Sequence, residues 1–301
     1  MVSPTVPAGL SQAELFTVTA GGAESNVARH LAALGFDTHW LSRLGDDALG
    51  DRILASLSES GVTVESVTRD PINPTGVYFK DPVPDGRGAV SYYRSGSAAS
   101  QMSPSDFDRW PFGAARWVHT TGITAALSAS CDALVERIVE RAPTLHYGVS
   151  FDINYRPALW WTREIAAARC LQLGRQCQVV LVGLDEAQEL WGISTATDVA
   201  DLFSTVPTVV VKDGANEAIE ILQTPRGSRT AHRVPAHTVE VVEAIGAGDA
   251  FAAGYLAGYL RGDSPETRLA AGHRLAAWTL GSLHDHRPMP ATSIPGASAT
   301  S

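Results

Sequence analysis

Short apolar runs alternate along this chain with longer segments in which apolar residues recur every three or four positions. The longer pattern predicts helices, for example from Asn26 through Leu31 to a stop at Gly35. The short runs predict strands at 38–44, 117–122, 149–154, 179–182, 208–214, 218–222 and 233–242. Strands that alternate with helices of this length predict an α/β fold, with a doubly wound, mainly parallel sheet and helices on both faces.

One β-rich stretch breaks this alternation. Residues 75–79 and 89–94 both favour strands, and the segment 84–88 between them favours a turn. We predict an antiparallel hairpin that covers a site. Because alternate residues of a strand share a face, Tyr92 and Arg94 point together and Tyr93 points away. That polar face suits a sugar acid, whose carboxylate the arginine would bind; an ordinary exposed edge strand is the alternative.

The two ends of the chain differ from its middle. Residues 1–10 are Pro-rich and polar and show no strand pattern, whereas 15–19 alternate like a strand. From Arg287 onward Pro, Ser, Thr and Ala predominate, which predicts a flexible tail at 287–301. A chain of 301 residues can form one large domain or two small ones. The sequence has no internal repeat, and we expect a single domain over 1–301.

The most informative stretch is a pair of glycines before an Ala-rich helical segment. Gly246 and Gly248 follow the apolar residues 238–242 and let the backbone approach a ligand closely. The first turn of a helix suits an anion such as phosphate, because its N–H groups are unpaired. Phosphate would repel the carboxylate of Asp249, so we expect this carboxylate to accept a proton from an attacking hydroxyl. The alternative is that Asp249 caps the helix and the glycines form a tight turn.

Polar residues also follow one of the predicted strands at a spacing of two. Asp152, Asn154 and Arg156 leave one face of that strand or lie at its carboxyl end. Ligands of open parallel sheets bind in the crevice beyond that end, which makes these residues candidates for substrate contacts. A strand-end turn held by hydrogen bonds of the Asp and Asn side chains explains the same pattern equally well.

Composition narrows the possible partners and location. The formal net charge of −9 argues against nucleic acid, whose phosphates require clustered Lys and Arg. No window of about 18 uninterrupted apolar residues occurs, so we expect no membrane span. Cys131, Cys170 and Cys177 are an odd, widely spaced set that fits reduced thiols in a core. The N-terminus lacks the basic-then-apolar pattern of a signal peptide. We therefore expect a cytoplasmic protein that binds a small molecule.

These segments resemble the ribokinase (PfkB) family of carbohydrate kinases. Residues 21–28 together with Leu34-Gly35 are similar to the N-terminal signature of that family, and residues 246–251 are similar to its C-terminal signature. The resemblance covers nearly the whole chain after about residue 10. The segments most similar to the 2-keto-3-deoxygluconate kinases within the family are 23–26, 92–100, 121–124 and 152–156 followed by Leu159-Trp160.

The resemblance implies a ribokinase-like fold with a small β-sheet lid at about 9–22 and 75–97, and a homodimer that forms through the lids. The implied activity is that of an ATP-dependent sugar kinase, which transfers the γ-phosphoryl group to a hydroxyl of 2-keto-3-deoxygluconate. Fructokinase or another ribokinase-type sugar kinase is an alternative activity. A catalytically silent sugar-binding protein is another, because a fold does not guarantee an activity.

The resemblance also implies roles for individual residues. Asp249 would be the catalytic base, and the amides of 246–248, which are Gly246, Ala247 and Gly248, would form an anion hole. The residues implied to contact the sugar acid are Gly22, Asn26, Tyr78, Tyr92, Arg94 and Arg156. The residues implied near the nucleotide are Lys212, Gly214 and His273. Mg²⁺ would bridge the ATP phosphates, with Glu186 as a candidate ligand through water.

The sequence departs from the family pattern at several positions. Glu243-Ala244 replaces the usual Asp-Thr where the resemblance implies a monovalent-cation site, and Gly183 replaces the Asn of the usual Asn-x-x-Glu. His273 stands where an Asn is frequent near the adenine. The first strand of the family, which precedes the lid, has no counterpart after Met1. We expect such a strand upstream of Met1, because its loss would leave ladder groups of its neighbours unpaired.

Overall fold

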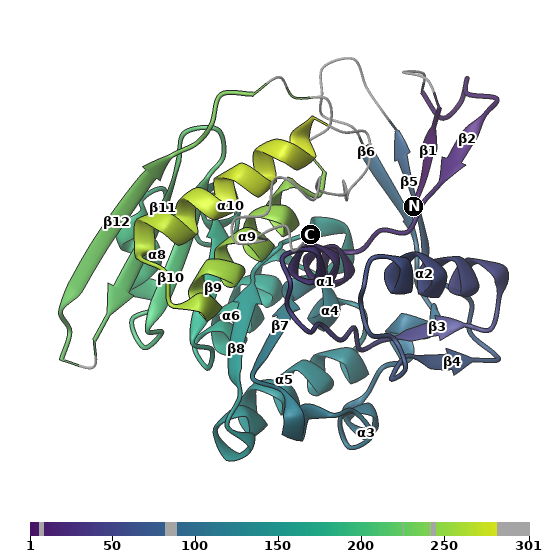
Figure 1. Cartoon of the computed structure of the whole chain (residues 1–301), viewed down its shortest axis with the longest axis horizontal. Coiled ribbons are helices and arrows are strands. Elements are labelled where there is room, and N and C mark those ends of the chain that lie inside the picture. The colour runs from purple at the N-terminus through teal and green to yellow at the C-terminus, as the bar shows by residue number, and fades with distance from the viewer. Residues whose placement is uncertain (6–8, 82–88, 225, 240, 242–244, 282–301) are drawn as a thin grey trace, which may run out of the picture.

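A six-stranded sheet forms the centre of the computed structural model, which describes residues 1–5, 9–81, 89–224, 226–239, 241 and 245–281 (Figure 1). Its strands are β7 (Trp117–Thr121), β8 (Gly148–Asp152), β9 (Val179–Gly183), β10 (Thr208–Asp213), β11 (Glu217–Gln223) and β12 (Arg229–Pro235), in the order β12-β11-β10-β9-β8-β7. Strands β7 to β10 run parallel, and β11 and β12 extend the sheet as antiparallel strands. The predicted α/β class is confirmed.

Helices cover both faces of this sheet because its central strands are apolar on both sides. Along β9, Val179 and Leu181 pack into one cluster of helices, and Val180 and Val182 pack into the other. The helices on the first face are α1 (Ala23–Ala33), α9 (Ala247–Arg261) and α10 (Pro265–Leu280). Those on the second are α5 (Ala129–Leu145), α6 (Arg163–Gly174), α7 (Leu184–Trp191) and α8 (Ala196–Leu202). A run that is apolar at every position is therefore buried between two layers of helices.

Close packing fixes α9 against α10 and, together with α10, against the sheet. Gly254 of α9 faces α10, and a Cβ atom at this position would lie 2.5 Å from the carbonyl oxygen of Ala271. A buried ion pair between Glu220 of β11 and Arg268 of α10 joins this helix pair to the sheet. The start of α9 at Ala247, which belongs to the predicted site, is thus held by the packing of the whole helix pair.

A second, smaller sheet lies to one side of the first (Figure 1). Its strands are β1 (Val2–Pro4), β2 (Phe16–Val18), β5 (Val77–Asp81) and β6 (Ala89–Tyr93), in the order β2-β1-β5-β6. Strands β5 and β6 pair antiparallel with Tyr78 opposite Tyr92, which confirms the predicted hairpin. Its predicted turn at 84–88 lies outside the described residues. The small sheet uses parts of the segments expected for the lid, 9–22 and 75–97, and adds β1 to them.

The prediction that residues 1–10 contain no strand is wrong. Val2–Pro4 forms β1, which pairs antiparallel with β2 and parallel with β5. Three residues that include a proline give no periodic signal, and both partner strands are distant enough in the sequence that local pattern cannot reveal them. Tertiary pairing decides the conformation here.

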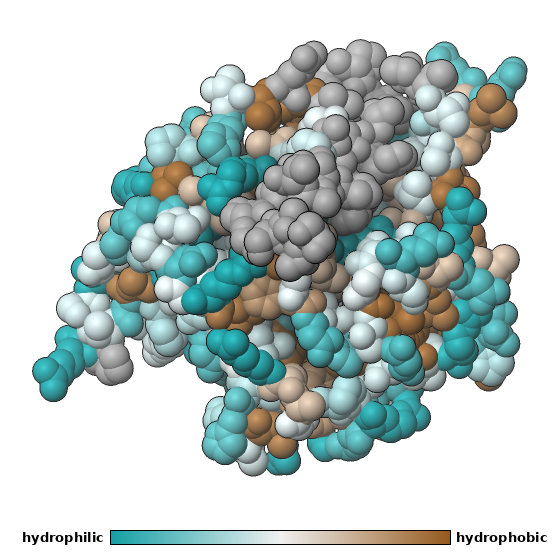
Figure 2. Space-filling view, in the orientation of Figure 1, coloured by the Kyte–Doolittle hydropathy of each residue, from teal (hydrophilic) through white to brown (hydrophobic). Residues whose placement is uncertain are grey.

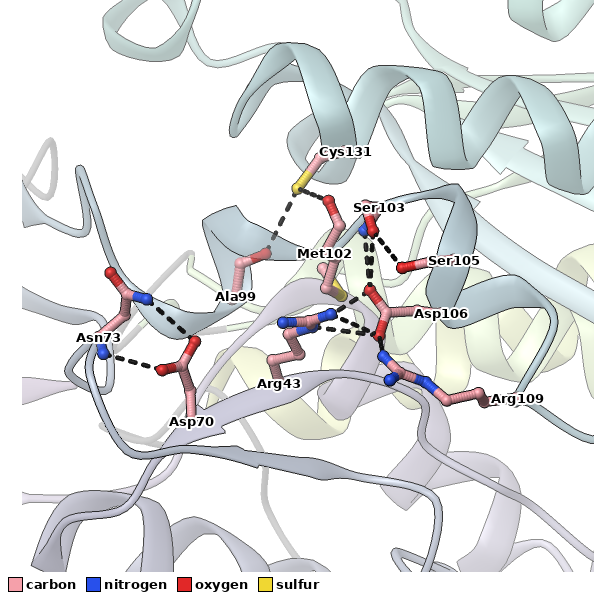
Figure 3. A network of polar contacts seen from close by, with 10 residues as sticks. All are labelled: Arg43, Asp70, Asn73, Ala99, Met102, Ser103, Ser105, Asp106, Arg109 and Cys131. Atoms are coloured by element: carbon pink, nitrogen blue, oxygen red, sulfur yellow. Dashed lines mark hydrogen bonds and ion pairs between the residues drawn. The ribbon is translucent and has the colours of Figure 1, made fainter.

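A two-stranded parallel sheet, β3 (Arg43–Gly45) and β4 (Thr68–Asp70), carries α2 (Ala48–Glu59) beside it. The strand predicted at 38–44 is therefore shorter and shifted, although His39 forms an isolated bridge with Thr63. The Asp70 side chain closes the following turn by accepting hydrogen bonds from the backbone N–H and the Nδ2 of Asn73 (Figure 3).

Asp106 joins this small unit to the rest of the molecule (Figure 3). It lies in α3 (Pro104–Phe107), is fully buried, and accepts hydrogen bonds from Arg43 of β3, from Arg109 and from the Ser103 amide. Burial alone would raise the pKa of Asp106, but these donors together lower it below its ordinary value. The carboxylate is therefore ionised and paired in the folded protein.

The remaining elements are short, and the thiols are internal. They are α4 (Gly122–Ala126) and the 3-10 helices η1 (Ala98–Gln101), η2 (Phe112–Ala114) and η3 (Pro157–Leu159). All three cysteines are buried and free, as predicted for core thiols, and burial raises the pKa of Cys131 to about 11. Within the described ranges, no helix combines the length and the apolar character that a membrane crossing requires. The predicted tail at 287–301 lies outside these ranges.

Candidate active site

A cavity of about 1540 Å³ opens between the carboxyl ends of the parallel strands and the small sheet. It is lined by the predicted site residues Gly22, Asn26, Tyr78, Tyr92, Arg94, Arg156, Glu186, Lys212, Gly214, Gly246, Ala247, Gly248, Asp249 and His273. Of the residues that the sequence analysis placed in the site, Asp152 does not line the cavity. The fold thus collects residues that are spread over most of the chain, and their individual roles remain predictions.

Two asparagines hold the carboxylate of Asp249, which lies in the first turn of α9. Asn26 of α1 donates from Nδ2 to Oδ2 at 2.9 Å, and Asn154, which follows β8, donates from Nδ2 to Oδ1 at 3.3 Å. Asn154 has a φ of 39°, in the left-handed region that Asn tolerates better than most residues. The N-cap of α9 is Gly246, with a φ of 87°, so Asp249 is not the capping residue of the alternative interpretation.

The N-terminus of α9 faces the same cavity. Amides in the first turn of a helix have no partner within the helix and carry partial positive charge. A Cβ atom on Gly248 would have only the Nζ of Lys212, at 3.9 Å, as a described heavy-atom neighbour within 4 Å outside its own turn. The space above the turn is therefore open, and the turn is a suitable place for an anion such as a phosphoryl group.

Lys212 brings a positive charge to this end of the cavity. Its Nζ donates to both carboxylate oxygens of Asp152, at 3.0 and 2.9 Å. Burial would lower the pKa of Lys212, but Asp152, Glu186 and Asp249 outweigh burial and raise it. Asp152 is 1% exposed and positions this ammonium group, which differs from the predicted contact between Asp152 and the sugar.

Arg94 directly follows β6, and two of its guanidinium nitrogens lack a partner within the described part of the chain. Its Nε and Nη2 atoms are buried and have no hydrogen-bond partner among the described residues, and its Cζ lies 4.2 Å from the centre of the Tyr92 ring. Burial lowers the pKa of Arg94, and Tyr92 and Glu24 oppose that shift. Tyr93, by contrast, is 68% exposed. The cavity lining includes Tyr92 and Arg94 but omits Tyr93, as strand alternation predicts.

Glu186 also lines the cavity, and its charge and that of Lys212 act on each other. Its Oε1 accepts a hydrogen bond from the Tyr155 amide at 2.8 Å, and its Oε2 accepts one from the Gly183 amide at 2.7 Å. Burial raises the pKa of Glu186, while Lys212 acts in the opposite direction. Within the described residues, no group of three or more His, Cys, Asp or Glu side chains is arranged to hold a metal ion directly.

Gly214 and His273, which are predicted together with Lys212 to lie near the nucleotide, belong to different parts of the fold. Gly214 follows β10 and has a φ of 51°, which favours glycine in the turn that leads to β11. His273 of α10 is buried, with its Nε2 3.0 Å from the carbonyl oxygen of Val234 and its ring against Phe251. Because that carbonyl can only accept, Nε2 carries a proton.

Sequence reasoning missed two contacts of this site. Asn154 was named only as one of three residues at a spacing of two, and its bond to Asp249 was not foreseen. Glu24 of α1 is not among the predicted site residues, yet it lines the cavity. Its Oε1 accepts hydrogen bonds from Thr121 at 2.7 Å and from Thr124 at 2.6 Å. The available signal was that residues 23–26 and 121–124 both resemble the same subgroup.

Comparison with known proteins gives a consistent result. Residues 2–292 match the family described as "pfkB family carbohydrate kinase". The chain is 35% identical over 272 residues to the 2-dehydro-3-deoxygluconokinase of Bacillus subtilis, covering 89% of this chain and 83% of that protein. It is 32% identical over 253 residues to fructokinase-1 of Oryza sativa, covering 82% and 76%. A PfkB protein from Polaromonas sp. JS666 superposes with a TM-score of 0.84 at 34% identity, covering 94% and 93%.

Proposed function

Because the chain belongs to the pfkB family of carbohydrate kinases, we propose that it phosphorylates a hydroxyl of 2-keto-3-deoxygluconate, also called 2-dehydro-3-deoxygluconate. The protein is a sugar kinase, a phosphotransferase with an alcohol as acceptor, and its family implies ATP as the phosphoryl donor. The observation that carries the choice of substrate is the buried edge of the Arg94 guanidinium group, which pairs with none of the described residues.

A sugar acid satisfies Arg94 and a neutral sugar does not. The carboxylate of the acid can accept from Nε and Nη2 together, the bidentate geometry that arginine favours. A neutral hydroxyl would leave at least one buried donor of a charged group without a strong acceptor, which costs about 1–3 kcal/mol or more. The resemblance of fructokinase-1 to this chain keeps a neutral hexose as the alternative substrate.

The opposite end of the cavity supports phosphoryl transfer. The attacking sugar oxygen forms its bond to the γ-phosphorus as the bond from that phosphorus to the oxygen of the leaving ADP breaks, and Asp249 accepts the hydroxyl proton. Asn26 and Asn154 orient the carboxylate of Asp249 for this role. The amides of residues 246–248 and the Nζ of Lys212 would stabilise the charge on the transferring group, which is the main requirement of this reaction.

The nucleotide and its metal ion fit the charged end of the site. We assign the nucleotide to the side formed by Lys212, Gly214 and His273. Bound Mg²⁺ supplies charge neutralisation for the phosphates. Glu186 fits an ion held through water, because both of its oxygens already accept amide hydrogens and retain further lone pairs. A monovalent-cation site near Glu243 and Ala244 would lie outside the described residues.

Substitution of Arg94 by Met should raise the KM for 2-keto-3-deoxygluconate by about 10- to 150-fold, the equivalent of a lost charge-assisted pair worth about 1.5–3 kcal/mol. The KM for ATP should stay within about twofold of its wild-type value, because Arg94 is assigned to the sugar side alone. A coupled assay of ADP release over a panel of sugar acids and neutral hexoses measures both constants.

The matched control is Arg163→Met, which removes an exposed arginine that does not line the cavity. An unchanged KM for the acid in Arg94→Met would contradict the assignment of the carboxylate site. A wild-type protein that releases ADP with fructose and with none of the acids would instead support the fructokinase alternative.

The outer face of the small sheet supports a dimer. Phe16, Phe79 and Tyr93 line a shallow hollow with Leu10 and Ser91, and the Phe79 and Tyr93 rings meet edge to face at 5.5 Å. Figure 2 shows apolar surface beside β2 at the upper right. A second copy of the chain offers the same hollow and the same exposed Tyr93 ring, which suits a symmetric interface. We assign this face to a homodimer formed through the lids.

Substitution of Tyr93 by Asp should convert a dimer to a monomer in light scattering coupled to size-exclusion chromatography, because a charge would be buried against its symmetry mate. Ile72→Asp is the control, since Ile72 is 86% exposed outside the small sheet and its variant should stay dimeric. A monomeric wild type, or a Tyr93→Asp variant with the mass of a dimer, would rule out this interface.

A further inference from the structure

Glu24 is a cavity-lining carboxylate to which the phosphoryl-transfer mechanism assigns no role. It lies in the first turn of α1, two residues before Asn26, and its Oε1 accepts short hydrogen bonds from the hydroxyls of Thr121 and Thr124. Thr121 ends β7 and caps α4, and Thr124 lies within α4. The two hydroxyls fix one oxygen of the carboxylate and leave Oε2 with no hydrogen bond among the described residues.

Glu24 and Arg94 have opposite charges and line the same cavity, yet they do not pair among the described residues. The charge of Glu24 opposes the lowering of the Arg94 pKa, but in the described structure Glu24 hydrogen-bonds to Thr121 and Thr124 and not to Arg94. Nε and Nη2 of Arg94 are buried and unpaired in the described part of the chain, although a carboxylate is the best partner for them. Something must therefore keep the carboxylate of Glu24 where it is.

The two threonine hydroxyls supply that restraint. Movement of Glu24 toward Arg94 would break hydrogen bonds of 2.7 and 2.6 Å to an ionised acceptor, which are among the stronger hydrogen bonds in proteins. It would also leave the two hydroxyls without that partner. The guanidinium group of Arg94 consequently stays open toward the cavity, and the free oxygen of Glu24 remains a fixed acceptor beside it.

We propose that Glu24 binds a hydroxyl of the sugar acid through Oε2, and that Thr121 and Thr124 act as positioning residues that hold Glu24 away from Arg94. This assignment rests on the proposed function, because the carboxylate of the substrate takes the place on Arg94 that Glu24 would otherwise occupy. A carboxylate accepts hydrogen bonds and cannot donate them, so Glu24 selects a hydroxyl at that position. A substrate with a carboxylate at one end and hydroxyls along its chain matches both groups together.

Thr124 gives a cleaner test than Thr121, whose hydroxyl also caps α4 by accepting from the Ile123 amide. Thr124→Val removes the hydroxyl at nearly constant shape, and Thr124→Ser retains it. Once released on one side, Glu24 can close onto Arg94, so Thr124→Val should raise the KM for 2-keto-3-deoxygluconate about tenfold. Thr124→Ser should stay close to the wild type. The kcat and the KM for ATP should change by less than about twofold in both variants.

The decisive experiment places Thr124→Val in a background with a neutral residue at position 24. Glu24→Gln should itself raise the KM for the acid about 10- to 100-fold, because the charged acceptor is lost. Thr124→Val should then add almost nothing, since Gln has no charge to draw it onto Arg94. The coupling between the two sites is read directly from this double-mutant cycle.

The outcomes separate this inference from the proposed function. A wild-type protein that releases ADP with no sugar acid would overturn both. An active wild type in which Thr124→Val raises the KM by the same factor with and without the Glu24→Gln substitution would overturn the inference alone. A wild-type KM in Glu24→Gln would also overturn the inference. A rise in the KM for ATP in Thr124→Val that parallels the rise for the acid would overturn it too, because it would indicate a purely structural role for Thr124.

Discussion

Replacement of Asp249 by Asn is expected to lower kcat by about 10²- to 10⁴-fold, the range typical of a lost general base. The KM values for sugar and ATP should change little, because the interaction that is lost acts in the transition state and not in the ground state. Release of ADP in a coupled assay with 2-keto-3-deoxygluconate measures the effect. We expect the same fractional loss with every sugar that the wild type accepts.

An ordinary Asp, with a pKa near 3.9, is too weak a base to remove a hydroxyl proton before the reaction starts. It must therefore act in the transition state. Phosphoryl transfer has a loose transition state, so the proton can leave late, and orientation of the acceptor matters more than its basicity. Asn26 and Asn154 provide that orientation. Asp198→Asn, at an exposed carboxylate of α8, is the control. A kcat close to that of the wild type in Asp249→Asn would remove this residue from the mechanism.

Replacement of Asp106 by Asn should lower the free energy of unfolding by about 3–5 kcal/mol at pH 7, because it removes the buried carboxylate that pairs with Arg43 and Arg109. Arg43 is the partner that matters most, since its side chain is 18% exposed and that of Asp106 is fully buried. Denaturation by urea or guanidinium chloride measures the change. Asp108→Asn, two residues away in an exposed pair with Arg137, should cost no more than about 1 kcal/mol.

The stability difference between the wild type and Asp106→Asn should depend on pH, with a sign set by the pKa of Asp106. The pKa of Asp106 is lowered in the folded protein from its ordinary value of 3.8. The stability it contributes is therefore present in full above the unfolded pKa and is lost as the pH falls through the lower folded value. The difference between the wild type and Asp106→Asn should shrink below a pH of about 4. A difference that stays constant down to a pH of about 2 would contradict the assignment of the charge to Asp106.

The parts of the fold that the sequence predicts well are those in which local pattern and burial agree. The run at 179–182 is apolar at every position, and the structure buries it between two helical layers as β9. The alternation of Tyr92, Tyr93 and Arg94 likewise places the first and third residues toward the cavity. The first case is a continuous apolar run and the second is an alternation with a period of two, and in both a few consecutive residues contain the information.

The parts that it does not predict depend on which strands are neighbours. Asp152 is at the right end of β8 to meet a ligand, but it meets Lys212 from β10 because β8 and β10 flank β9 in the sheet. Strand order is a tertiary property, and spacing along one strand does not contain it. The pairing of β1 with β2 and β5 was missed for the same reason.

The hairpin of β5 and β6 carries Tyr78 and Tyr92 toward the cavity and Phe79 and Tyr93 toward the outside. If two copies associate through their outer rings, the strands that also bear the inner rings become less free to move. A protomer in the dimer then loses less conformational entropy in the hairpin when it binds its sugar. Assembly and substrate affinity are thermodynamically linked in such an arrangement, so the concentration of the protein itself becomes a variable in how tightly it holds a sugar.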